Sequence, residues 1–140
     1  MVKKIKFMKS LLIIIAIFMS CASTQTGFEI SISSLKESDK PYPIIVLTNK
    51  NIDKVEFPKH YYQIEQKDFE KIEKECSIKG QERRLKLILI EIKKNNKIEK
   101  YFFNRKESID ILNSIQKLTS YYNNEDLAKN LLYLQKVTEN

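Results

Sequence analysis

Residues 84–103 read RLKLILIEIKKNNKIEKYFF, and this stretch decides the fold. Within residues 84–94 leucines occupy one set of alternating positions and isoleucines the other. Apolar residues on both faces predict a central strand that is covered on both sides, at least over residues 87–90. Asn95-Asn96 tolerates the positive φ values of a tight turn. Residues 97–103 are therefore expected to return as the second arm of a β-hairpin.

Three earlier segments also predict strands. Residues 28–33 alternate apolar and polar side chains, as a half-buried strand does. Residues 44–48 are a β-branched run after a proline-rich break, which is typical of a strand covered on both faces. In residues 52–57 Val55 and Phe57 share one face, and Pro58 ends that strand or places it at a sheet edge. Residues 61–64 are a further short extended piece.

The apolar spacing changes to that of helices in three other segments. Residues 66–76 place Phe69, Ile72 and Cys76 on one stripe. Asn104 and Glu107 have the spacing of a capping box, which opens a helix that ends near Asn123-Asn124. A last helix is expected over residues 125–136. Helices of these lengths are not stable alone, so they must pack on the sheet or on each other.

Together these elements predict an α+β fold. We expect a small antiparallel sheet of about five strands, with one helix inserted between strands and two helices at the C-terminus. Residues 28–140 are enough for a single domain with one core and too few for two.

The N-terminal segment has the pattern of a secretory signal peptide. Four lysines and no acids precede the apolar run of residues 11–19, and small residues follow it around Ser20 and Ala22. This order of basic, apolar and small residues is typical of an export signal. A helix of the apolar run would be about 14 Å long, half of the ~30 Å hydrocarbon core of a bilayer. We therefore expect residues 1–20 to be a signal peptide rather than a permanent membrane span.

Cys21 directly follows this run, and the segment resembles the lipobox of bacterial lipoproteins. In that family the small residue before the cysteine matches Ser20, whereas Phe18 and Met19 are bulkier than the usual pattern. The resemblance implies cleavage before Cys21 and lipidation of its thiol, with residues 21–27 as a tether to the domain. Cleavage after Ala22, which would release a soluble secreted protein, is the alternative.

Much of the net positive charge of the chain lies in the leader. The whole sequence has 25 Lys+Arg and 18 Asp+Glu, or +7, but four lysines and no acids lie in residues 1–20, which leaves 21 against 18, or +3. The remaining basic residues alternate with glutamates, so we expect a mixed-charge surface and no nucleic-acid partner. Once Cys21 is acylated or removed, Cys76 is the one remaining thiol, and it is expected to be a buried apolar residue.

The sequence offers no catalytic or ligand-binding motif. His60 is the single histidine; a zinc site needs three or four ligands, so we expect no metal. His60 is also the one available base for a nucleophilic serine, and the two glycines cannot form a phosphate-binding loop. We therefore expect a non-enzymatic protein without a cofactor.

Tyrosine pairs are the remaining candidates for recognition. Tyrosine is enriched at binding surfaces, and the adjacent Tyr61 and Tyr62 near Pro58 are the expected binding surface. The sequence thus predicts a lipid-anchored cell-envelope protein that faces the periplasm. We expect the membrane as partner through Cys21, and a protein or envelope ligand of unknown specificity. An immunity-type protein that neutralises a toxin is the alternative within this class.

Overall fold

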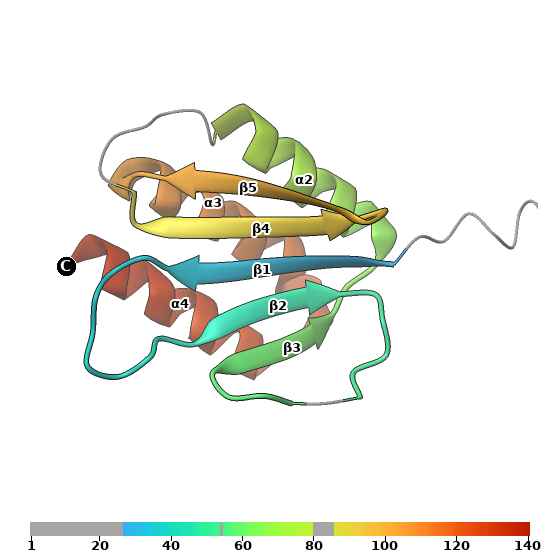
Figure 1. Ribbon diagram of the computed structural model, residues 1–140, viewed down its shortest axis with the longest axis horizontal. Coiled ribbons are helices and arrows are strands. Elements are labelled where there is room, and N and C mark those ends of the chain that lie inside the picture. Colours follow the sequence, from blue (N-terminus) through green and yellow to red (C-terminus); the bar gives the residue numbers. More distant parts are fainter. Residues whose placement is uncertain (1–26, 54, 80–85) are drawn as a thin grey trace, which may run out of the picture.

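The structure, a computed structural model, describes residues 27–53, 55–79 and 86–140. It confirms the α+β fold: a five-stranded sheet in the order β3-β2-β1-β4-β5, with the helices packed on one of its faces (Figure 1). The elements are β1 (Phe28–Ser34), β2 (Ile44–Thr48), β3 (Lys59–Gln63), α2 (Gln66–Lys79), β4 (Ile88–Lys94), β5 (Lys97–Phe103), α3 (Arg105–Thr119), the short 3-10 helix η1 (Ser120–Tyr122) and α4 (Glu125–Glu139).

The predicted hairpin is confirmed as β4 and β5. Asn95 and Asn96 have φ values of 52° and 60°, the left-handed values that a primed two-residue turn requires. β4 pairs antiparallel with β5 on one side and with β1 on the other. The expected strand began at Arg84, but β4 begins at Ile88, and residues 80–85 lie outside the described residues.

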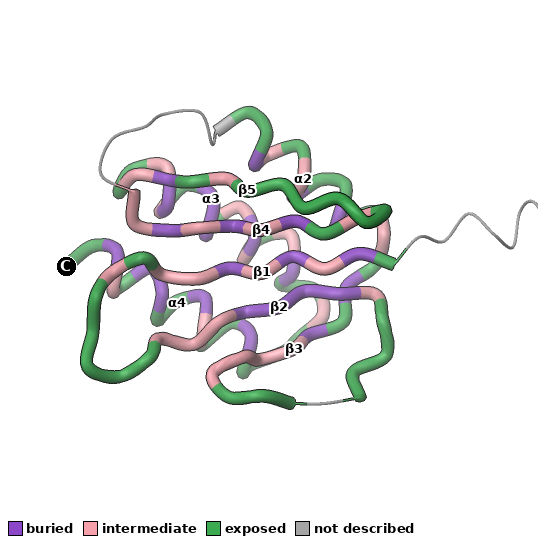
Figure 2. Tube along the Cα trace, viewed as in Figure 1, coloured by how far each residue is buried: buried purple, intermediate pink, exposed green. Residues whose placement is uncertain are grey.

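The hydrophobic core lies between the sheet and the helices. Side chains at alternate strand positions point toward the helix layer, which gives the alternation of buried and partly exposed residues along β1 and β4 (Figure 2). Phe28 of β1 stacks on Phe69 of α2 at 4.1 Å between ring centroids. Cys76 is fully buried in this core, as predicted.

Only one face of the sheet is covered by helices within the described residues, so the expectation of cover on both faces of β4 is wrong. Ile88 and Ile90 lie in the core, but Leu89 on the other face is only partly buried. Its cross-strand neighbours are Ser33 and Phe102, and they shield it in place of a second layer. In β2, by contrast, Val46 is fully buried on this face, between Tyr61 and Ser31 of the adjacent strands.

The strand expected over residues 52–57 is also wrong. Val55 and Phe57 are 78% and 80% exposed, and neither they nor the other described residues of this segment form a strand. β3, residues 59–63, takes the free edge of β2 instead, because it buries Tyr62 and leads into the buried Ile64. The segment 49–58 carries the chain back to the start of β2, so β3 runs parallel to β2 and the sheet is mixed rather than wholly antiparallel.

The helices begin and end close to the predicted residues. Asn104 accepts a hydrogen bond from the Glu107 amide and the Glu107 side chain accepts one from the Asn104 amide, so the predicted capping box is present. α3 and α4 are antiparallel neighbours in Figure 1 and pack against each other beneath the sheet.

Candidate functional site

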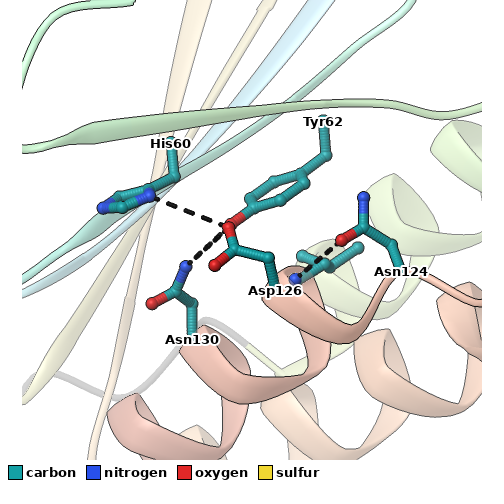
Figure 3. A network of polar contacts seen from close by, with 6 residues as sticks. His60, Tyr62, Asn124, Asp126 and Asn130 are labelled. Atoms are coloured by element: carbon teal, nitrogen blue, oxygen red, sulfur yellow. Dashed lines mark hydrogen bonds and ion pairs between the residues drawn. The ribbon is translucent and has the colours of Figure 1, made fainter.

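One polar cluster joins the edge strand β3 to the first turns of α4 (Figure 3). The Tyr62 hydroxyl donates a hydrogen bond of 2.6 Å to Asp126 Oδ2 and accepts one of 2.7 Å from Asn130 Nδ2. The Asn130 amide lies 3.4 Å from the same carboxylate oxygen. His60 Nδ1 lies 3.9 Å from that oxygen, close enough for an ion pair but too far for a hydrogen bond.

Local sequence explains how these side chains meet. His60 and Tyr62 are two residues apart in a strand, so both side chains lie on the face toward the helices. The Asn124 side chain accepts a hydrogen bond of 3.0 Å from the Leu127 amide and thereby begins α4. Asp126 is then in the first turn, where a negative charge favours the helix dipole, and Asn130 lies four residues on along the same helix face.

The electrostatics of this cluster keep Tyr62 protonated. Burial first, and then the hydrogen bond to Asp126, raises the pKa of the Tyr62 phenol well above its ordinary value. A phenol that holds its proton this firmly is a donor to the carboxylate and not a base. The arrangement orients Asp126 and fastens α4 to β3.

A second cluster joins the start of α2 to η1 with the same chemistry. Asp68 is buried, and its Oδ2 accepts a hydrogen bond of 2.6 Å from the Tyr122 hydroxyl and another from the Tyr121 hydroxyl. The two tyrosine rings stack at 4.3 Å. The Tyr122 hydroxyl also accepts a hydrogen bond of 2.7 Å from the Glu65 amide. Burial, followed by the bond to Asp68, raises the pKa of Tyr122.

The structure separates the two tyrosines that were predicted to form a binding surface. Tyr61 is partly exposed on the helix-free face of the sheet, whereas Tyr62 is 6% exposed and lies on the opposite face in the cluster with Asp126. Asp126 and Asp68 were not predicted from the sequence as partners of the tyrosines. The available signal was the position of each aspartate in the first turn of a predicted helix. Cys21, the predicted lipidation site, lies outside the described residues.

Large apolar side chains are exposed in a different place, the segment that precedes β3. Ile52, Val55 and Phe57 are all exposed there, and Phe57 stands four residues before Tyr61. Exposed apolar side chains mark a contact surface where they form a contiguous patch. We call Val55 and Phe57, which precede the edge strand β3, the edge patch.

The described residues contain no group of three or more His, Cys, Asp or Glu side chains placed to hold a metal ion. Among the helices of the described ranges, none is long and apolar enough to cross a membrane. Comparison of the chain with protein-family models, with curated proteins and with solved structures gives no significant match.

Proposed function

We propose that this chain is a lipid-anchored cell-envelope protein whose domain binds a protein or another envelope ligand and catalyses no reaction. The observation that carries the proposal is the order of residues 3–21: basic residues, an uncharged apolar run, and then Cys21 after a small residue. That order suits export followed by lipidation.

The start of the domain is compatible with a short tether. β1 begins at Phe28, and Gly27 before it is exposed. Residues 22–27 span at most about 20 Å when fully extended. An acyl chain on Cys21 would therefore hold the domain close to the membrane surface. Stable anchoring takes more than one acyl chain, and a lipoprotein cysteine carries two or three.

The edge patch supports a binding role. Val55 and Phe57 are apolar, largely exposed and adjacent to an edge strand. Aromatic side chains that become buried in a partner contribute strongly to binding at protein interfaces. The tyrosines of the two polar clusters, in contrast, are engaged with the carboxylates of this chain itself.

The anchor is tested by the mass of the mature protein recovered from cells that express the full sequence. We expect a chain that begins at Cys21 and carries a diacylglycerol, and labelled palmitate incorporated into it. The Cys21→Ser variant should lose the label and leave the membrane fraction, while Cys76→Ser keeps the label. A mature chain that begins at Ser23, or an uncleaved chain without fatty acid, would show that the anchor is wrong.

A further inference from the structure

Four lysines gather at the end of the sheet where the chain enters the domain. Phe28, the first residue of β1, pairs with Lys94, and the β4–β5 turn and the end of β2 lie at the same end (Figure 1). A groove of about 540 Å³ opens there, lined by Gly27, Lys50, Lys93, Lys94, Lys97 and Ile98 together with the two turn asparagines. We call this set the basic end.

The basic end carries a net positive charge. Lys93 lies 3.9 Å from Glu29, and Lys94 lies 3.7 Å from Glu73, so these two lysines are partly neutralised. Among the ion pairs of the described residues none involves Lys50 or Lys97. No carboxylate of these residues lines this groove, and the glutamates Glu70, Glu73 and Glu99 line the adjoining hollow, which shares Lys94 and Lys97. Ile98 adds an apolar side chain that is 57% exposed among these charges.

We propose that the basic end rests on the anionic headgroups of the membrane that holds the anchor. This inference rests on the proposed function, because the tether of residues 21–27 enters the domain at Gly27, which itself lines the groove. A tether of at most about 20 Å keeps this end nearest to the bilayer. The opposite end of β1 lies roughly 20 Å further away at 3.3 Å per residue. Lysines near an anionic surface attract it, and an exposed apolar side chain enters the headgroup boundary.

The test uses mature protein that is recovered from cells expressing the full chain and is reconstituted in vesicles. An environment-sensitive fluorophore is placed at Ile98→Cys, or at Arg105→Cys at the start of α3, just beyond the far end of β5, and a quencher is attached to the lipid. Cys76 is fully buried and does not compete for the label. In vesicles that contain phosphatidylglycerol we expect strong quenching at position 98 and weak quenching at position 105. Phosphatidylcholine alone, or about 0.5 M salt, should weaken the quenching at position 98 and reduce the difference, because it removes or screens the attraction and leaves only the proximity that the tether imposes.

The charge dependence is tested with a matched pair of variants. Lys50→Gln/Lys97→Gln removes two charges from the basic end, and Lys106→Gln/Lys129→Gln removes two exposed charges from α3 and α4. The first should lower the ratio of docked to undocked domain roughly thirtyfold, and the second should leave it unchanged. Equal quenching at position 98 in both kinds of vesicle, or no effect of Lys50→Gln/Lys97→Gln, would overturn the inference.

Failure of the anchor is distinguishable from failure of docking. The mass of the recovered protein reports acylation separately. If it is not acylated, the same protein added to the vesicles from outside still reports whether the basic end binds phosphatidylglycerol.

Discussion

Tyr62 links two parts of the chain that are far apart in sequence. Its ring extends from β3 into the core, and its hydroxyl donates a hydrogen bond to Asp126 on α4, 64 residues later in the chain. A buried hydroxyl that loses its partner leaves an unsatisfied polar group, which costs more than the net value of the bond itself. The clusters at Asp126 and Asp68 therefore both stabilise the packing of helices at the sheet's β3 side.

Replacing Tyr62 with Phe removes the hydrogen bonds of its hydroxyl to Asp126 and from Asn130, and should reduce the free energy of unfolding by about 1–2 kcal/mol at the usual net value of each bond. Asp126→Ala removes the acceptor and should cost a similar amount, and the double variant should cost less than the sum, because both changes remove the same hydrogen bond. Urea unfolding of the three variants measures this coupling. Tyr61→Phe is the matched control, because its partly exposed side chain lies on the other face of the sheet; we expect no measurable change. Fully additive costs would show that Tyr62 and Asp126 do not interact.

The raised pKa of Tyr62 predicts how stability depends on pH. In the unfolded chain the phenol ionises near its ordinary pKa of about 10, but in the folded protein it stays protonated to higher pH. This contribution to stability is complete below pH ~10 and is lost as the pH rises above it. The Tyr62→Phe variant should therefore lose less stability than the unaltered protein between pH ~8 and ~11. Urea unfolding across that range measures the difference, and parallel curves for the two proteins would contradict it.

At the scale of elements, the caps of the helices determine where they begin. Replacing Asn104 with Ala removes the side-chain acceptor for the Glu107 amide and should destabilise the protein by about 1 kcal/mol. Asn104→Ser keeps a capping oxygen and should restore most of the loss. Thermal unfolding of the two variants measures the effect. If Ser and Ala at this position are equally destabilising, the capping box contributes nothing.

Elements whose sequence signals are local could be predicted from the sequence. Elements that are decided by competition between two segments for the same place in the sheet could not. The turn at Asn95-Asn96 and the capping box at Asn104 depend on residues a few positions apart, so both were predicted. The segment 52–57 has the alternation of a strand, but only one segment can pair with the free edge of β2. β3 takes that place because Tyr62 and Ile64 become buried, which depends on the helix layer and not on the local pattern.

The candidate site was less predictable for the same reason. The sequence marks Tyr61 and Tyr62 as a pair, and strand geometry places their side chains on opposite faces. Which of the two faces the core is set by the packing of β3 on the helix layer, where Ile64 is buried beside Tyr62 and Asp126 accepts the hydrogen bond of its hydroxyl. The exposed edge patch arises because residues 52–57 are excluded from the sheet, an outcome that the whole fold determines.

At the scale of the whole molecule, a sheet that is covered by helices on one face within the described residues can offer its other face and its edges to solvent or to partners. Charge pairs occupy much of the helix-free face: Lys93 lies 3.9 Å from Glu29 and Lys100 lies 3.8 Å from Glu91. Charged side chains of this kind disfavour sheet-to-sheet aggregation. The edge patch at β3 is apolar instead, and it lies at the opposite edge of the sheet from β5. A domain whose basic end faces the membrane would present both edges sideways, where a neighbouring envelope protein can reach them.

The double variant Val55→Ser/Phe57→Ser should therefore weaken the binding of a partner and leave folding unchanged. Both side chains are mostly exposed, so the free energy of unfolding should change by no more than about 0.5 kcal/mol. A core change such as Ile45→Ser, by comparison, should cost several kcal/mol, about 3 or more, because it leaves a cavity and a buried hydroxyl. A photo-crosslinking residue at position 57 of the full-length protein should give one discrete adduct in intact cells, and the same residue at Lys117 should give none. The adduct should also disappear when Val55 is replaced by Ser beside the crosslinker. Adducts of equal yield at both positions would show that the edge patch is ordinary exposed surface, and that the protein's partner binds elsewhere.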